Sequence, residues 1–148
     1  MKESSADKFT GKRVCFFAGV ENVSALSERQ WYQNDIRILG ELGFDVVIAT
    51  SFRNIPFNCD LYFSWWPTKS IFPLIVAKLC RKPIIIVVGG EEVLNSIQTA
   101  ESYFSKPVHV RLAIKSCLRY ADYVLTLSEH IRGEAANLHA REILLVPA

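Results

Sequence analysis

Short runs of apolar residues recur along the chain, separated by stretches that mix polar and apolar positions. The clearest run is Ile84–Val88, whose five β-branched residues follow Pro83 and end at Gly89-Gly90. Because no polar residue interrupts it, this run is typical of a strand covered on both faces, as in a parallel sheet. Further runs with strand character span residues 14–19, 44–50, 60–67, 122–127 and 142–147. The pattern therefore predicts a sheet of about six strands.

The segment between the first two runs has the periodicity of a helix. Its apolar side chains recur at spacings of three and four residues up to Leu42. Ser27 and Gln30 form a predicted capping box at its start, and Gly43 stands where the end of a helix favours glycine. We therefore predict a helix over residues 27–42.

Three more segments predict helices. Residues 69–82 are apolar with basic ends, and Pro73 must lie in the first turn of that helix or kink it. Residues 108–121 have helical periodicity, and Ser128 is a predicted cap for a helix that follows the fifth strand, with Glu129 in its first turn. Residues 93–107 have no clear periodicity beyond one potential helical turn.

Strands that alternate with helices predict an α/β fold, a doubly wound parallel sheet in a Rossmann-like, three-layer αβα arrangement. A chain of 148 residues fits a single domain, residues 13–148, after a polar leader at 1–12 that we expect to be flexible. For six strands we expect the order 3-2-1-4-5-6, which puts a ligand crevice between the first and fourth strands. Loops 19–27 and 89–107 would then face that crevice.

Composition excludes several classes of protein. The formal net charge is +2 and no basic run is present, which argues against binding of nucleic acid. The first residues are polar and no apolar stretch approaches ~18 residues, so we expect a cytoplasmic protein without a signal peptide or membrane span. The cysteines and histidines lack the spacing of a disulfide framework or metal site, so we expect reduced, mostly buried cysteines and surface or helix-end histidines. These residues are Cys15, Cys59, Cys80 and Cys117, and His109, His130 and His139.

The glycines that follow the central run are the first candidates for a ligand site. Gly89 and Gly90 come where a strand ends, and Glu91 and Glu92 follow them. Glycine lets the backbone turn sharply or approach a ligand closely, and a carboxylate can act as a base or hydrogen-bond a polyhydroxylated ligand. The alternative is a tight turn followed by solvated glutamates.

Two tryptophans end the third predicted strand. Trp65 or Trp66 can stack on a sugar ring, whose C–H face suits an aromatic surface. Because side chains alternate along a strand, we expect the two rings on opposite faces, with at least one in the core. No Gly-x-Gly-x-x-Gly motif, Walker loop or catalytic triad can be identified, and no catalytic residue is predicted.

Three basic residues recur four apart on the predicted helix 108–121. Arg111, Lys115 and Arg119 would lie on one face, where they can meet anionic lipid or phosphate. Peripheral contact with the inner face of a membrane is one interpretation of this stripe. A solvated helix face is the other.

Several short motifs, in this order and spacing, resemble the amino-terminal half of a GT-B glycosyltransferase of the group 1 (family 4) kind. They are Gly89-Gly90-Glu91-Glu92-Val93, Tyr103-Phe104-Ser105-Lys106-Pro107, Ala121-Asp122-Tyr123-Val124-Leu125-Thr126-Leu127-Ser128-Glu129 with Arg132, and Ile143-Leu144-Leu145-Val146-Pro147. The resemblance covers residues 13–147. Glu91 and Glu92 replace an aromatic residue and an aspartate of the family pattern, Ala148 replaces an asparagine, and the first loop lacks the usual glycine pair.

The resemblance implies an acceptor-side domain that transfers sugar from a nucleotide-sugar donor when completed by a carboxyl-terminal domain or a partner chain. That second Rossmann-like domain is absent from this sequence, so we expect the chain to be inactive by itself. A small-molecule or glycan acceptor and a metal-independent reaction without a cofactor are implied. The implied substrate-binding residues are Gly19, Glu21, Trp66, Gly89, Gly90, Glu91, Glu92, Ser128 and Arg132. Two alternatives stay open, a non-catalytic Rossmann-like binding or regulatory module and one subunit of a split glycosyltransferase.

Overall fold

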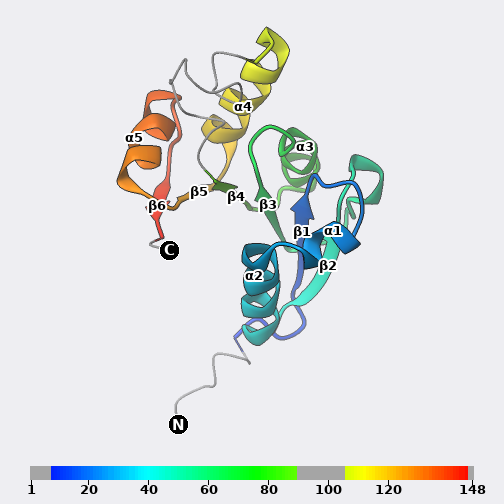
Figure 1. Cartoon of the computed structure of the whole chain (residues 1–148). Helices are drawn as coiled ribbons and strands as arrows, with labels where there is room; N and C mark the ends of the chain where they lie inside the picture. Colours follow the sequence, from blue (N-terminus) through cyan, green and yellow to red (C-terminus); the bar gives the residue numbers. More distant parts are fainter. Residues whose placement is uncertain (1–7, 90–105, 147–148) are drawn as a thin grey trace.

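The computed structural model describes residues 8–89 and 106–146, which form one six-stranded α/β domain (Figure 1). The strands are β1 Arg13–Ala18, β2 Asp45–Ala49, β3 Leu61–Trp65, β4 Ile84–Val88, β5 Tyr123–Thr126 and β6 Ile143–Leu145. The helices are α1 Ser24–Ser27, α2 Gln30–Glu41, the 3₁₀ turn η2 Phe52–Asn54, α3 Ile71–Cys80, α4 Val108–Tyr120 and α5 Glu129–Asn137. Residues 93–105, for which one helical turn was considered, lie outside the described residues.

All six strands are parallel, which confirms the predicted doubly wound, Rossmann-like architecture. Their order is β2-β1-β3-β4-β5-β6. Cys15 in β1 lies beside Val47 in β2 on one side and beside Tyr62 in β3 on the other. Strands paired on both sides and covered on both faces need apolar side chains throughout, which is why the uninterrupted apolar runs identified them.

The predicted strand order, 3-2-1-4-5-6, is wrong. After β2 the chain makes only η2 before Asp60, so it adds no strand beyond β2 and returns at once to the other side of β1. The 2-1-3-4-5 order is the other common doubly wound arrangement, and its strand order reverses between β1 and β3. The crevice therefore lies between β1 and β3, where the loop after residue 18 meets the turn after residue 65.

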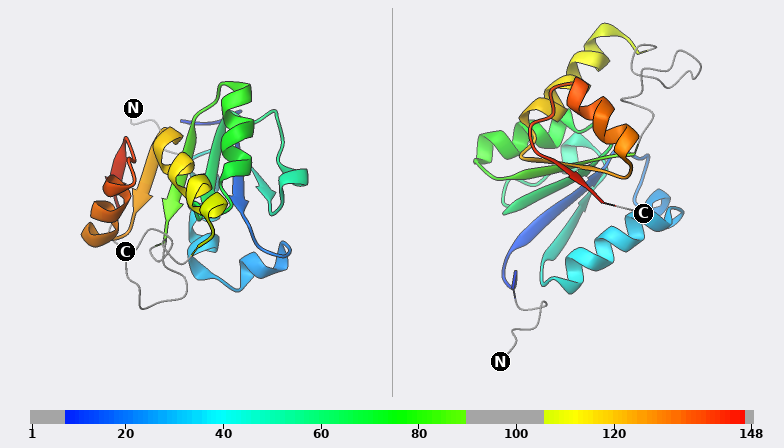
Figure 2. Two further views of the ribbon diagram at one scale, coloured as in Figure 1. Left: turned by 90° about the horizontal axis from the view of Figure 1, so that it is seen from above. Right: turned by 90° about the vertical axis from the view of Figure 1, so that its left-hand side faces the viewer.

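The helices cover the two faces of the sheet unequally. On one face α3, α4 and α5 pack over a large core that includes Ile86, Ile114 and Val124. On the other face α1 and α2 pack over a smaller core around Phe16 and Trp65. Figure 2 shows α3 and α4 on one side of the sheet and α1 with α2 on the other.

The signals at the ends of the helices were predicted with mixed success. Gly43 has φ 101° and follows α2 directly, with Phe44 N–H donating to the Leu39 carbonyl at 3.2 Å, which confirms the predicted end of the helix. Ser128 caps α5 by accepting a hydrogen bond from Ile131 N–H at 3.3 Å, as predicted. The capping box at Ser27 is wrong.

The sequence between residues 24 and 30 contains a break that the periodicity did not indicate. Ser27 ends the short helix α1, and its hydroxyl donates to the Ser24 carbonyl at 2.6 Å. The longer helix α2 begins only at Gln30, after Arg29 in an extended conformation. Pro73 lies in the first turn of α3, as predicted.

The cysteines are core residues, as predicted. Cys15, Cys59 and Cys117 are buried and Cys80 is partly buried, all within or against the larger core. Burial raises the pKa of the Cys15 and Cys117 thiols to about 12, so both are protonated and unreactive at neutral pH. Phe9, which belongs to the polar leader, stacks on Phe44 with ring centroids 4.5 Å apart.

Candidate functional site

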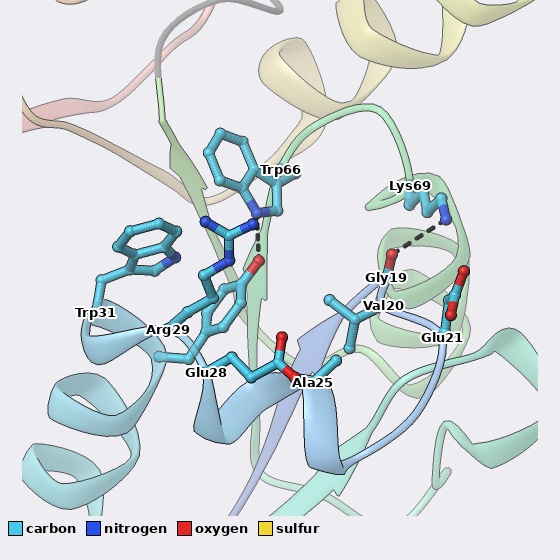
Figure 3. Close-up of a pocket in the computed structure, with 10 residues that line it drawn as sticks. Gly19, Val20, Glu21, Ala25, Glu28, Arg29, Trp31, Trp66 and Lys69 are labelled. Atoms are coloured by element: carbon cyan, nitrogen blue, oxygen red, sulfur yellow. Dashed lines mark hydrogen bonds between the residues drawn. The ribbon is translucent and has the colours of Figure 1, made fainter.

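A cleft of about 570 Å³ opens at the carboxyl-terminal edge of the sheet, where β1 and β3 end (Figure 3). This edge, at the point where strand order reverses, is where open α/β sheets bind their ligands. The cleft is lined by Gly19, Val20, Glu21, Ala25, Glu28, Arg29, Trp31, Tyr32, Trp66 and Lys69. Three segments thus meet there: the loop after β1, the first turn of α2 and the turn after β3.

Trp66 forms one wall of the cleft from a strained backbone conformation. Its φ of 69° is in the left-handed region, which costs a bulky residue about 1–3 kcal/mol. Several contacts hold it there. Its N–H extends the sheet by donating to the Val87 carbonyl at 3.0 Å, and its carbonyl accepts from the Ser70 hydroxyl at 2.8 Å. Ser70 is buried against Ser64, with their hydroxyl oxygens 2.6 Å apart.

The indole of Trp66 is fixed by contacts on two sides. Its Nε1–H donates to the Tyr32 hydroxyl at 2.5 Å. Its ring lies against Gly89, where an added Cβ would come within 2.0 Å of Cζ3 of the indole. Gly89 is outside the left-handed region, so its missing side chain serves this close approach. Strand order explains the contact, because β3 and β4 are neighbours.

Trp65 and Trp66 lie on the same side of the sheet, which corrects the expectation that alternation separates them. Both pack with the smaller core, and their ring centroids are 5.5 Å apart. Alternation holds only while the backbone stays extended, and the left-handed conformation of Trp66 ends it. Trp65 is buried, as expected for at least one of the pair.

The opposite side of the cleft is formed by Gly19 and Lys69. The Lys69 ammonium donates to the Gly19 carbonyl at 3.0 Å. A Cβ on Gly19 would lie 2.3 Å from Cδ of Lys69, so the lysine stem also needs a glycine beneath it. Figure 3 shows Lys69 and Glu21 on one side of the cleft and the two labelled tryptophans on the other.

The first turn of α2 supplies the remaining aromatic surface. Tyr32 is buried, whereas the Trp31 ring is 40% exposed and the Arg29 guanidinium lies 5.3 Å from its centroid. The cleft therefore contains one anchored ring, Trp66, and one accessible ring, Trp31, beside charged side chains.

Behind this frame, Asp35 accepts a hydrogen bond from Trp65 Nε1–H at 2.8 Å. Burial raises the pKa of the Asp35 carboxyl, and the hydrogen bond from Trp65 opposes that shift only in part. Asp35 therefore supports the tryptophans and does not line the cleft itself.

The charged side chains of the cleft are balanced. Glu21 and Glu28 carry two negative charges, and Arg29 and Lys69 carry two positive charges. Neither glutamate forms an ion pair with any cation of the described residues. Within residues 8–89 and 106–146 the lining contains no His, Cys, Ser or Thr, so this part offers hydrogen-bonding groups, aromatic surface and the carboxylates of Glu21 and Glu28 as bases.

The structure brings together some of the predicted site residues. Gly19, Glu21 and Trp66 line the cleft, and Gly89 lies directly behind Trp66. Gly90, Glu91 and Glu92 lie outside the described residues.

Ser128 and Arg132 lie elsewhere. Ser128 is the cap of α5, and Arg132 faces a separate hollow between α5 and β6, where its guanidinium lies 3.7 Å from the Glu129 carboxylate. Neither lines the cleft.

Sequence reasoning missed Glu28, Arg29, Trp31, Tyr32 and Lys69 as site residues. Trp31 and Tyr32 fall within the apolar periodicity of the predicted helix 27–42, and Arg29 lies outside loop 19–27, which we expected to face the crevice. Lys69 was missed because the wrong strand order separated its turn from the first loop. The signal available in the sequence was the position of Lys69, four residues after Trp65, at which β3 ends.

The predicted basic stripe is divided in the structure. Arg111 is half-buried in α4 with Nε enclosed and without a hydrogen-bond partner. Lys115 and Arg119 lie further along α4, in a hollow that does not include Arg111.

Comparisons of the chain with protein-family models, with curated proteins and with solved structures found no match. Within residues 8–89 and 106–146, no group of three or more His, Cys, Asp or Glu side chains could hold a metal ion. No helix of this part is both long and apolar enough to cross a bilayer. The Rossmann-like fold and the geometry of the cleft therefore carry the functional argument.

Proposed function

We propose that this chain is the acceptor-side domain of a nucleotide-sugar-dependent glycosyltransferase, and that the cleft between β1 and β3 holds the sugar or other hydroxyl-bearing acceptor. The observation that carries this proposal is the position and chemistry of the cleft. It lies at the switch point of the sheet and combines the rings of Trp31 and Trp66 with two carboxylates that form no ion pair within residues 8–89 and 106–146.

A saccharide suits this combination of groups. The C–H face of a sugar ring packs against an indole, while its hydroxyls donate to carboxylates and accept from ammonium or guanidinium groups. The anchored position of Trp66 means that little conformational entropy is lost when a ring stacks on it. Glu21 and Glu28 are exposed at the cleft and have unused acceptor capacity.

The charge balance favours an acceptor over the diphosphate of a donor. A nucleotide diphosphate carries two or more negative charges and needs a surplus of cations or backbone donors. Here the two cations are matched by two glutamates, and Lys69 already donates to Gly19. Groups that bind the leaving nucleotide would then come from a second Rossmann-like domain.

The resemblance to GT-B glycosyltransferases agrees with this assignment at the level of the fold. The strand order expected for this fold is wrong, and what the structure shares with the resemblance is a Rossmann-like parallel sheet with its crevice beside β1. The likeness in motifs at residues 121–129 and 143–147 supports the proposal further.

A second candidate is a non-catalytic module that binds a small ligand by itself. The observation that favours it is the lining of the cleft, whose described residues include no histidine, cysteine, serine or threonine. The two candidates differ in what a second domain adds, because a binding module is complete alone and a transferase half is not.

The test is a transfer assay with UDP-, GDP- and ADP-sugars and methyl glycoside acceptors, measured as released nucleoside diphosphate. Residues 1–148 alone should give no release above a protein-free blank. Release should appear when the chain is co-produced with the polypeptide encoded directly after residue 148 or by a neighbouring open reading frame. A GT-B enzyme catalyses transfer in the cleft between two domains, and a single domain cannot exclude water from that cleft.

The matched variants are Trp66→Ala, which removes the anchored ring, and Phe72→Ala, which removes an exposed ring on α3 outside the cleft. In the completed enzyme only Trp66→Ala should raise KM for the acceptor. Turnover by the isolated chain, or an unchanged acceptor KM in Trp66→Ala, would contradict the proposal. Tight glycoside binding without transfer in any combination would favour the binding module.

A further inference from the structure

A second hollow, of about 520 Å³, lies at the opposite edge of the sheet and is basic. It is lined by Lys115, Arg119, Tyr120, His139 and Arg141. The first three come from the second half of α4, which ends just before β5 begins, and the other two from the turn that leads into β6. Residues about twenty positions apart therefore meet where the strands start.

The cations in this hollow are not balanced by carboxylates of the described residues. The part of its lining that the structure describes contains no Asp or Glu. Lys115, Arg119 and Arg141 form no ion pair with a carboxylate of the described residues. Three permanent cations thus share one concave surface, in contrast to the balanced charges of the cleft between β1 and β3.

The ends of the two helices account for only part of this charge. α4 and α5 both end near the hollow, and cations near a helix carboxyl terminus are favoured by the macrodipole. Each helix end is equivalent to roughly −0.5 of an elementary charge, or about −1 for the pair. Against three permanent cations this leaves a surplus of about +2, which matches the charge of a phosphate dianion.

His139 is in a conformation that glycine adopts more easily. Its φ is 68°, it follows Leu138, the C-cap of α5, and Ala140 N–H donates to the Ala135 carbonyl at 3.2 Å. This is the helix ending in which glycine is the usual residue. A histidine there places an imidazole in the hollow.

Tyr120 adds a neutral donor to the same surface. The side chain is 50% exposed, and the Arg119 guanidinium lies 5.6 Å from the centroid of its ring. A phenol and several cationic N–H donors together suit the three or four oxygens of a phosphate group.

We propose that this basic hollow binds a phosphate group, carried either by a soluble phosphate monoester or by a lipid headgroup. Lys115, Arg119 and Arg141 neutralise the dianion, and His139 and Tyr120 contribute further hydrogen bonds. The site is separate from the cleft between β1 and β3 and does not depend on the function proposed for it.

The experiment compares Arg119→Gln/Arg141→Gln with Arg37→Gln/Arg53→Gln. Both double variants lose the same charge, and Arg37 and Arg53 are exposed and lie outside the hollow. Calorimetry with inorganic phosphate and with glycerol 3-phosphate measures the soluble source. Sedimentation with vesicles of phosphatidylcholine, with and without phosphatidic acid, measures the lipid source. Thermal melting of each variant confirms that it is folded.

Inorganic phosphate should bind the wild type and the Arg37/Arg53 variant alike. It should bind the Arg119/Arg141 variant about tenfold more weakly or worse, because two charge-assisted hydrogen bonds are lost. Stronger binding of glycerol 3-phosphate than of inorganic phosphate would show that the ligand is a soluble phosphate monoester. Sedimentation of the protein with vesicles that contain phosphatidic acid, if inorganic phosphate prevents it, would show that the ligand is a lipid headgroup. Absence of phosphate binding at millimolar concentration, or equal weakening in both variants, would overturn the proposal.

Discussion

The two edges of the sheet use their polar side chains differently. At the edge where strands begin, Asp60 accepts the backbone N–H of Arg13 at 2.9 Å and Asp122 accepts that of Ile84 at 2.9 Å. Each aspartate immediately precedes one strand and accepts the first N–H of the adjacent strand. The same arrangement therefore joins β3 to β1 and β5 to β4. These carboxylates hold strands together.

At the edge where strands end, the polar side chains are turned toward a cleft. Glu21 and Glu28 have no cationic partner among the described residues, and Trp66 is held in a left-handed conformation by its surroundings. Satisfied polar groups stabilise a fold, whereas unsatisfied ones beside a strained residue are where a ligand is expected. For the carboxylates, this contrast gives Asp60 and Asp122 a structural role and is the reason we propose a binding role for Glu21 and Glu28.

The largest expected effect concerns the contact behind the cleft. Gly89→Ala puts a Cβ within 2.0 Å of the Trp66 ring, and overpacking of this kind costs about 1–3 kcal/mol. The same substitution at Gly40, inside α2 with no atom within 4 Å of the new Cβ, should stabilise by about 0.5–1 kcal/mol. Urea unfolding of both variants measures the two effects. Effects of the same sign would show that Trp66 does not depend on Gly89.

The next effect concerns the opposite edge. Asp122→Ala leaves the Ile84 N–H without its partner, which should cost about 1–2 kcal/mol. The nearby Lys78 ammonium, 3.6 Å from the carboxylate, adds little because the pair is exposed. Glu41→Ala, which removes only an exposed ion pair with Arg37, should cost less than about 0.5 kcal/mol. If urea unfolding gives the same loss of stability for Asp122→Ala and Glu41→Ala, Asp122 has no special structural role.

The smallest effect is a difference in pH dependence between Asp35 and Asp60. Burial raises the pKa of Asp35 above its usual 3.8, so the folded state binds that proton more tightly than the unfolded state. The stability that this proton contributes is present below pH 3.8 and lost as pH rises through the folded pKa. The hydrogen bond from Arg13 N–H is the main cause that lowers the pKa of Asp60, whose contribution is present above its usual value and lost as pH falls.

Substitution by asparagine separates these two cases. The stability of Asp35→Asn relative to the wild type should rise with pH across the acidic range, and that of Asp60→Asn should fall. Unfolding in urea at a series of pH values gives both slopes. Slopes of the same sign would mean that the two carboxylates have similar environments.

The sequence predicted the elements of this fold better than their neighbours in space. The run Ile84–Val88 was identifiable because burial on both faces leaves only apolar residues, and the Ser128 cap because its effect is local. The strand order depended on the connection at residues 50–60, which holds only η2 and adds no strand beyond β2. Adjacency of β1 and β3 is a long-range property that no local pattern encodes.

The cleft was predictable only in part for the same reason. Gly19, Glu21 and Trp66 were found from the ends of the strands, but their meeting depends on the strand order. The left-handed conformation of Trp66 is imposed by Tyr32, Ser70 and Gly89 together, and a sequence does not show that these residues touch.

The central claim, that the cleft between β1 and β3 binds a saccharide, can be tested through the indole N–H signals of the chain's three tryptophans. Trp31 and Trp66 line the cleft, whereas Trp65 is buried and donates to Asp35. In ¹H–¹⁵N spectra titrated with methyl glycosides of common hexoses and N-acetylhexosamines, the Trp31 and Trp66 signals should move with one saturation curve. The Trp65 signal should move much less. Unchanged signals from Trp31 and Trp66 with every glycoside would contradict the claim.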